Sequence, residues 1–395
     1  MRQILLIGLI FTASALAACG GGTADSPYDY CVAGTPPDAQ CWMEKRDNTS
    51  ENMQMAMDLG DRVITEMAPQ ERTREWTDAV LMVGMWELYR ATGTQDYLDY
   101  IQAWMDHHIE EGIVIGTSDT CAMAALAVRL YDITGEARYK AVVEDALDYL
   151  HHRALRTEAG GISHWGDMDV LGVGIWVDSL FMFGNVLTSL GETTGDADLM
   201  EEYAEQFRIF TDTLQKSIGF YKHAEGTIFE QDDNVYWGRG NGWVLAAGYD
   251  HLRVRLGLGL AQPPAMQEAL ETLAAAARQY QDADTGLYWT VLNRPGETYL
   301  ETSAAGLFGL GMARAWRNGF LGDEVLTSIA LSVKGLKSRI EYRDGVPYVT
   351  GVSAGTNVGD FDYYASIRQF DTIPYGYGIA IMLLCETAGL PLPTP

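Results

Sequence analysis

The residues best suited to chemistry form a heptad, Trp237 to Trp243, that reads W-G-R-G-N-G-W. Its three alternate glycines lack a Cβ and would let a ligand approach the backbone closely. The pattern predicts that a loop enters the next helix near Asn241, so that free backbone N–H groups and the positive helix end face the same space as the Arg239 guanidinium. That combination suits a carboxylate ligand. The alternative is a tight loop in which Arg239 makes a structural ion pair.

A second candidate, Asp178, lies in the first turn of a predicted helix whose buried stripe is Trp176, Leu180, Phe183 and Leu187. Asp178 lies off this stripe, where the helix dipole favours a carboxylate whatever its function and would lower its pKa. An acid catalyst needs a raised pKa, which burial under Trp176 or a nearby second carboxylate would provide. Asp119, at another predicted helix start, is the candidate for that carboxylate, and its alternative is a helix N-cap.

The elements that must position these residues are helices, since alternating strand patterns are scarce from about Asn48 onward. The segments 89–97 and 131–139 repeat one motif, in which Gly ends a helix and a polar residue starts the next, and 194–199 is a looser copy. These are predicted αα-hairpins. Helices are predicted over about 50–67, 73–92, 94–110, 120–134, 136–152, 175–190, 196–215, 242–257, 264–283, 302–317, 323–337 and 376–388.

Six such hairpins either stack into an open solenoid or close into a double ring. A solenoid needs uniform repeats, whereas the connections here differ greatly and are long at 153–174, 218–241 and 338–375. Long loops in compact domains are commonly functional. We therefore expect an all-α fold, a closed (α/α)6 barrel of six helical hairpins, with these loops gathered at one mouth.

Beyond the heptad, several motifs follow one another in a recognisable order. They are Gly160–His164, Trp176–Met182, Gly219–His223, Trp237–Trp243, Tyr299–Ser303 and Tyr375–Gly378. With these motifs, residues of about 50–390 resemble the unsaturated rhamnogalacturonyl hydrolases, glycoside hydrolase family 105, and the related unsaturated glucuronyl hydrolases. The resemblance implies an (α/α)6 barrel that removes the 4,5-unsaturated uronic acid left on oligosaccharides by polysaccharide lyases.

The same resemblance implies roles for single residues. Asp178 is expected to be the acid/base residue that protonates C4 of the vinyl ether and then activates the water that adds at C5. Asp119 stays the second predicted catalytic residue on the ground given above, as the carboxylate that would raise the pKa of Asp178. His223 and Arg239 are expected to hold the uronate and the 2- and 3-hydroxyls, as cations or as hydrogen-bonding groups, and Trp176 and Trp243 are expected to stack on the sugar. The predicted substrate-binding residues are Trp176, His223, Arg239, Trp243, His164 and Thr77.

Two other functions remain open on the sequence alone. A conventional inverting glycosidase on the same barrel needs paired carboxyl groups about 6.5–9.5 Å apart. A non-catalytic surface glycan-binding lipoprotein would keep the aromatic residues and need no poised acid.

The composition limits the classes of molecule that this protein is expected to bind. The net charge of −27 would repel phosphate, which excludes nucleic acid as a partner and suits an acidic, soluble surface. No C-x-x-C or H-E-x-x-H motif is present, so we predict no metal and no cofactor. Cys121 and Cys385 lie in apolar helical patterns and are predicted to be core thiols. The pairs His107–His108 and His151–His152 lie near helix ends and are interpreted as partners of the helix dipole.

The N-terminus predicts export. Residues 1–18 have the basic start, short apolar stretch and small-residue end of a signal peptide, and L-A-A-C resembles a bacterial lipobox with Cys19 as the lipidated residue. Residues 19–45 are predicted to be a tether and 46–390 the hydrolase domain. Gly20 after the cysteine indicates sorting to the outer membrane. Cys31 and Cys41 form a disulfide or stay as thiols, which the spacing leaves open.

Overall fold

The structure is a computed structural model that describes residues 46–395. The predicted signal peptide 1–18, lipidation at Cys19, the tether 19–45 and the Cys31–Cys41 pair lie outside the described residues. Among the helices that are described, none combines the length and the apolar character needed to cross a membrane.

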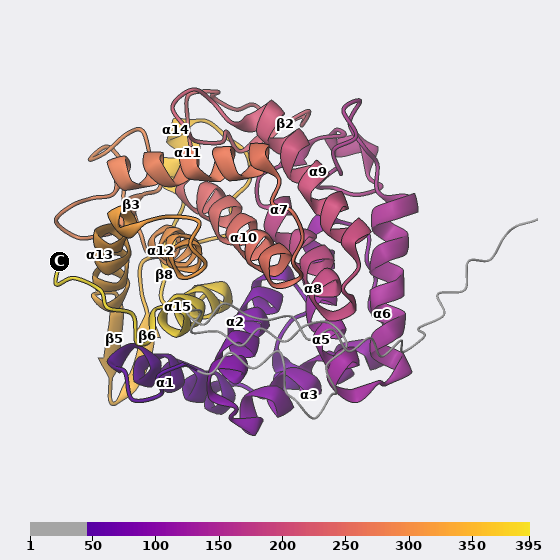
Figure 1. The fold of residues 1–395 in the computed structure, drawn as a ribbon, viewed down its shortest axis with the longest axis horizontal. Helices are drawn as coiled ribbons and strands as arrows, with labels where there is room; N and C mark the ends of the chain where they lie inside the picture. Colours follow the sequence, from indigo (N-terminus) through magenta and orange to yellow (C-terminus); the bar gives the residue numbers. More distant parts are fainter. Residues whose placement is uncertain (1–45) are drawn as a thin grey trace, which may run out of the picture.

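Six helical hairpins form two concentric rings (Figure 1). The outer helices are α1 (Glu51–Glu66), α3 (Gln95–Glu111), α6 (Ala137–Asp148), α9 (Ala197–Leu214), α11 (Pro264–Tyr280) and α13 (Leu326–Lys337). The inner helices are α2 (Trp76–Thr92), α5 (Ala124–Thr134), α8 (Gly184–Thr194), α10 (Gly238–Gly257), α12 (Thr302–Arg317) and α15 (Pro374–Thr387). Each inner helix contacts the next, and α15 contacts α2, so the ring closes. The predicted all-α (α/α)6 barrel is confirmed.

The short connections of the ring follow the repeated glycine motif. Gly93, Gly135 and Gly195 end α2, α5 and α8 with φ of 75°, 67° and 71°, a left-handed conformation that L side chains disfavour. Each therefore lets an inner helix turn directly into the next outer helix, as the sequence predicts. The connections that run from outer to inner helices are the long ones.

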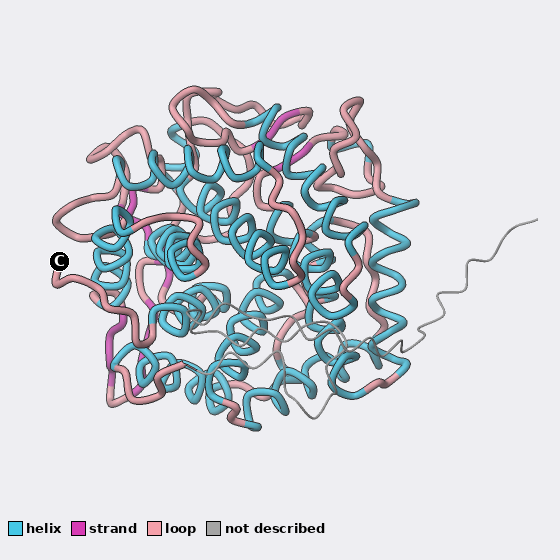
Figure 2. The backbone as a smooth tube through the Cα atoms, in the orientation of Figure 1, coloured by secondary structure: helices cyan, strands magenta, loops and turns pink. Residues whose placement is uncertain are grey.

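The remaining elements are short (Figure 2). The helical turns are η2 (Pro69–Glu71), α4 (Ser118–Cys121), η3 (Tyr149–Arg153), η4 (Asp169–Leu171), α7 (Ser179–Met182), η5 (Asp323–Val325) and α14 (Phe361–Ser366). The strands pair as antiparallel ribbons, β1 (Ile175–Trp176) with β2 (Ala224–Glu225), β3 (Tyr288–Trp289) with β4 (Leu300–Glu301), β5 (Ile340–Arg343) with β6 (Val346–Val349) and β7 (Val352–Ser353) with β8 (Gln369–Phe370).

Three predicted helix boundaries are wrong. The predicted helix 120–134 is divided into α4 and α5, and 175–190 is divided into β1, α7 and α8. Trp176 pairs with Ala224 in the β1–β2 ribbon, and this extended pairing delays the helix start to Ser179. The helix after the heptad begins at Gly238 rather than near Asn241. Most other predicted helices agree with the structure within about three residues.

The main core fills the space between and within the rings. Cys121 and Cys385 lie in it as buried free thiols, which confirms their prediction. At the C-terminal ends of the inner helices the core is bounded by ion pairs. Glu192 of α8 forms an ion pair with Arg253 of α10 at 2.9 Å and another with Arg129 of α5. Arg314 of α12 bridges Asp250 at 3.0 Å and Glu386 of α15 at 3.4 Å.

Candidate active site

The first turns of the inner helices meet at the opposite end of the barrel, which we call the mouth. Trp76 of α2 stacks on Tyr375 of α15, with ring centroids 4.8 Å apart. The Arg239 guanidinium of α10 lies 5.1 Å from the Tyr375 ring and 3.8 Å from Glu301, which caps α12. Because all inner helices begin here, their positive dipole ends face one region. The long loops enter the barrel at this end, as predicted.

Two carboxyl groups and an imidazole meet at the mouth. One ligand-type atom each from Asp119, His164 and Asp178 lies within 4.8 Å of the other two. Asp119 is held in α4, whose N-cap is Thr117. Asp178 follows the β1–β2 ribbon, where the N–H of Val177 donates to the His223 carbonyl at 2.9 Å. The alternative in which Asp119 is itself the N-cap is therefore wrong.

His164 connects the two carboxylate-bearing segments. Its Nδ1 lies 3.0 Å from the Ser179 hydroxyl, and its Nε2 lies 3.9 Å from Oδ2 of Asp119. One face of the ring stacks on Trp176, with a centroid distance of 4.3 Å and an interplanar angle of 4°. His164 therefore lies inside the site, where its backbone carbonyl also accepts from the Ser118 N–H at 2.9 Å.

The surroundings raise the pKa of both carboxyl groups. Burial raises the pKa of Asp119 to about 6, with a further contribution from the Asp178 charge and opposition from His164. Burial also raises the pKa of Asp178, although His164 and Arg239 act in the opposite direction. Of the two causes predicted for a raised pKa of Asp178, burial or a second carboxylate, burial accounts for it. Carboxyl groups with raised pKa values are able to deliver a proton near neutral pH.

His223 is held as a neutral hydrogen-bonding group. Its Nδ1 lies 2.7 Å from the Tyr364 hydroxyl, and its ring centroid is 4.4 Å from that of Trp237. Burial lowers the pKa of His223 well below its ordinary value, and the neighbouring His164 and Arg239 lower it further. Of the cationic and hydrogen-bonding roles that the sequence leaves open for His223, this setting favours the hydrogen-bonding one.

Several buried polar atoms at the mouth have no hydrogen-bond partner among the described residues. They are Oδ1 of Asp178, Nε2 of His223 and the indole Nε1 atoms of Trp165, Trp176 and Trp237. Most buried polar atoms in proteins are hydrogen-bonded. Several unpaired ones gathered at the mouth therefore indicate a site that binds the polar atoms of a ligand.

The structure corrects the predicted role of Arg239 as a direct clamp for the uronate. Its side chain is fully buried. The NH1 group donates to the carbonyl and hydroxyl of Ser353, and the NH2 group donates at 2.8 Å to the Ala354 carbonyl and the Thr356 hydroxyl. Since four of its five N–H bonds are directed at the protein, Arg239 holds segment 353–356 at the mouth and is not available for bidentate carboxylate binding.

The predicted stacking of Trp243 on a sugar is also wrong. Because α10 begins at Gly238, Trp243 lies in its second turn, 1% exposed, with its ring centroid 4.4 Å from that of Phe181. The heptad glycines likewise serve packing, not ligand approach. A Cβ on Gly240 would lie 2.5 Å from the Trp237 ring, and one on Gly242 would lie 2.7 Å from Cβ of Leu307.

The other predicted residues lie at the mouth in different settings. Trp176 is 2% exposed and forms an aromatic wall beside His164, so that its stacking on a sugar stays a prediction. Thr77 is partly buried in the first turn of α2, next to Trp76. Sequence reasoning missed Trp165, Phe229 and Tyr364, which pack around Trp176 and His223. Each of the three is an aromatic residue in a long loop. The sequence alone does not indicate which side of the site such a residue packs against.

The Asp119, His164 and Asp178 group also has donor types that hold divalent cations, so any measurement of metal binding to this protein must distinguish it from other sites.

The comparisons with known proteins agree with this geometry. The family model described as Glycosyl Hydrolase Family 88 matches residues 48–390. An unsaturated rhamnogalacturonyl hydrolase, YesR of Bacillus subtilis, is 25% identical over 82% of this chain and 93% of its own.

Solved structures share the fold. A possible family 105 member from Klebsiella pneumoniae superposes with a TM-score of 0.74 at 25% identity, covering 86% of this chain and 93% of its own. The unsaturated glucuronyl hydrolase of Bacillus sp. GL1 gives a TM-score of 0.64 at 17% identity, covering 85% and 95%. The resemblance seen in the sequence motifs is confirmed, and the chain belongs to Glycosyl Hydrolase Family 88, a family of glycoside hydrolases.

Proposed function

We propose that this glycoside hydrolase removes the 4,5-unsaturated uronic acid from the non-reducing end of lyase-generated oligosaccharides. The observation that carries the proposal is the pair Asp119 and Asp178, two adjacent carboxyl groups at the mouth whose pKa values are both raised. The activity named for the YesR relative supports the same substrate class.

The chemistry needs one group that donates a proton and then activates water. Asp178 gives its proton to C4 of the C4=C5 double bond, and positive charge develops at C5 beside the ring oxygen. The resulting carboxylate takes a proton from water as the water oxygen bonds to C5, which regenerates the acid. The hemiketal at C5 then opens the ring, and the hemiacetal left at C1 releases the rest of the glycan. The raised pKa favours the protonated form of Asp178, which the first step needs.

Substrate binding is assigned to neutral donors instead of a buried cation. Nε2 of His223 and the indole N–H groups of Trp176 and Trp237 are buried at the mouth, and none of them has a hydrogen-bond partner among the described residues. The first turns of α2, α10, α12 and α15 add positive dipole ends at the mouth. In a protein of net charge −27, these groups support binding of an anionic sugar.

The two alternatives fit the site less well. An inverting glycosidase places its two carboxyl groups about 6.5–9.5 Å apart, so that a water molecule fits beside the sugar. Carboxyl oxygens of Asp119 and Asp178 lie within 4.8 Å of each other, which leaves less room. A purely glycan-binding protein has no use for buried acids with raised pKa values, which cost stability.

The reaction is tested with unsaturated oligosaccharides from rhamnogalacturonan, ulvan-like and glucuronyl sources, by loss of the absorbance of the unsaturated uronate. Asp178→Asn should lower kcat by about 10²–10⁴-fold, because the proton donor is removed. Asp212→Asn, which changes an exposed aspartate on α9, should leave kcat unchanged. Full activity of D178N would contradict the mechanism, and absence of activity of the wild type on every substrate would contradict the function.

We also propose that the mature protein is an outer-membrane lipoprotein anchored through Cys19, which rests on the L-A-A-C sequence and Gly20. In cells fed a palmitate analogue, the full chain should be labelled and should sediment with outer membranes. Cys19→Ser should remove both properties, because the acceptor thiol is lost. Labelling that persists in C19S would contradict the proposal.

A further inference from the structure

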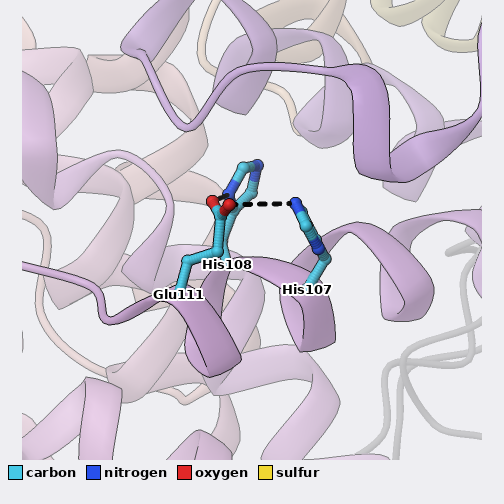
Figure 3. A group of neighbouring side chains, drawn as sticks. All are labelled: His107, His108 and Glu111. Atoms are coloured by element: carbon cyan, nitrogen blue, oxygen red, sulfur yellow. Dashed lines mark ion pairs between the residues drawn. The ribbon is translucent and has the colours of Figure 1, made fainter.

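A second cluster with donor types typical of a metal site contains neither catalytic carboxyl group and lies at the C-terminal end of α3. His107, His108 and Glu111 point toward one another there (Figure 3). Nε2 of His107 lies 3.5 Å from Oε1 of Glu111, and Nδ1 of His108 lies 3.4 Å from Oε2 of the same carboxylate. The family resemblance assigns no role to this cluster.

The hydrogen bonding of His108 determines which of its ring nitrogens carries the hydrogen and which presents a lone pair to the Glu111 carboxylate. The residue is 3% exposed, and its Nε2 lies 3.1 Å from the Arg72 carbonyl, which can only accept. Nε2 therefore carries the hydrogen, and in the neutral ring Nδ1 is an acceptor. Nδ1 is buried and has no hydrogen-bond partner among the described residues. A buried acceptor aimed at the Glu111 carboxylate is repelled unless a proton or a metal ion lies between them.

The spacing fits a transition-metal ion. Zn²⁺ binds imidazole nitrogen at about 2.0–2.1 Å and carboxylate oxygen at about 2.0–2.2 Å, so two tetrahedral ligands of these types lie roughly 3.3–3.5 Å apart. The two N···O separations of 3.5 and 3.4 Å match that spacing. The bond from His108 to the Arg72 carbonyl is the outer-shell contact that commonly orients a metal-binding histidine.

We propose that His107, His108 and Glu111 bind a Zn²⁺ ion, with the remaining coordination supplied by water. Two imidazoles and one carboxylate are a known zinc ligand set. His107 and Glu111 are partly open to solvent, which gives the ion a path of entry.

The position of the site indicates its effect. His108 bonds to the segment before α2, and Arg74 of that segment donates to the Gly112 carbonyl at the end of α3 at 2.9 Å. The ion would fix the end of α3 against the segment that carries Trp76 and Thr77 to the mouth. We therefore expect Zn²⁺ to stabilise the fold without entering the reaction, so that this site does not depend on the proposed function.

The test uses the full chain without an affinity tag, titrated with Zn²⁺ by calorimetry and followed by thermal unfolding. The wild type should bind one Zn²⁺ at this site, and its Tm should rise by about 3 °C at saturation. His107→Gln and Glu111→Gln change partly exposed residues and should each weaken binding by at least about 100-fold, because loss of an outer-shell contact alone costs about 10–100-fold.

Three controls locate the bound ion and identify its type. His152→Gln removes a surface histidine that is 72% exposed and pairs with Asp148, and it should bind Zn²⁺ like the wild type. Asp178→Asn should also keep this Zn²⁺, because the ion does not lie at the catalytic group. Mg²⁺ at the same concentration should give no Tm shift, since it prefers all-oxygen ligands.

The proposal is overturned by any of three results. The first is that H107Q and E111Q bind Zn²⁺ as tightly as the wild type. The second is that binding is lost in D178N but kept in E111Q. The third is that no ion binds, in which case a proton shared between His108 and Glu111 at the helix end accounts for the cluster.

Discussion

At the scale of single residues, the catalytic pair is costly to the fold. Burial favours the protonated forms of Asp119 and Asp178, and the charge of Asp178 acts on Asp119 in the same direction. In the unfolded chain both carboxyl groups have ordinary pKa values. Burying them therefore lowers the free energy of unfolding at neutral pH. The same burial favours the protonated form, which an acid catalyst needs.

This cost gives a prediction for Asp119→Asn. The folded pKa of Asp119 is about 6 and its ordinary value is 3.8, so the folded state binds protons more tightly and loses stability as pH rises between these values. Removing the carboxylate should therefore stabilise the protein by about 1–3 kcal/mol at pH 7, after a discount for the partial exposure of the side chain. Below about pH 4 both carboxyl groups are protonated, and the gain should vanish.

The measurement is denaturant unfolding of wild type and D119N at pH 7 and at pH 3.5. An Asn that destabilises the protein equally at both pH values would mean that Asp119 has a structural role that the pKa argument omits. Activity should fall in the same variant, because the second carboxylate is lost from the site.

At the scale of elements, the heptad connects three segments. Arg239 holds segment 353–356, and Asn241 exchanges hydrogen bonds with the backbone of Tyr221, two residues before His223. The sequence pattern indicated the right family and a helix start within the heptad, but the helix begins at Gly238 instead of near Asn241. The expected use of the residues was also wrong. A glycine that lets a ligand approach and a glycine that lets a helix approach look the same in a sequence. The partner of Arg239 lies over 110 residues away, beyond the reach of local pattern.

The packing role of these glycines is tested with Gly240→Ala. The added Cβ would lie 2.5 Å from the buried Trp237 ring and 2.9 Å from Val177, the residue before Asp178. Overpacking of about 1–3 kcal/mol should exceed the gain of up to about 1 kcal/mol that Ala brings to a helix. We expect lower stability in urea and a lower kcat, because the displaced atoms adjoin the acid.

Gly116→Ala is the matched control, since a Cβ there has no atom within 4 Å among the described residues and the backbone is not left-handed. It should change neither stability nor activity. If G240A behaves like G116A, the glycines are not needed for packing, and the ligand-approach interpretation would regain support.

At the scale of the whole molecule, the parallel inner helices give the barrel two unlike ends. Their N-termini surround the carboxyl pair, and their C-termini meet at the ion-pair network around Glu192 and Arg314. Arginine suits that end because the helix dipoles are negative there. The closed ring was predictable from helical periodicity and the left-handed glycines, which are local signals. The network was not, because Glu192 and Arg253 are 61 residues apart and only the closed ring brings them together.

The network should be a major source of stability. Burial alone would raise the pKa of Glu192, yet Arg253, Arg129 and Arg90 hold it well below its ordinary value. Glu192→Gln removes the shared partner of these mostly buried guanidinium groups. Breaking a buried pair costs about 3–5 kcal/mol, and since the Glu192 side chain is 22% exposed we expect a loss of about 2–4 kcal/mol at pH 7.

The pH dependence of that loss separates the network from a simple packing defect. A carboxylate with a lowered folded pKa stabilises the protein above its ordinary value of about 4.5, and this stabilisation disappears as pH falls through the folded pKa. The gap between wild type and E192Q, measured by urea unfolding, should therefore be wide at pH 7 and narrow in strong acid. Glu144→Gln breaks the exposed Lys140 pair, which solvent screens, and should change the stability far less than E192Q. A gap for E192Q as small as that of E144Q would mean that the six inner helices are held together by apolar packing alone.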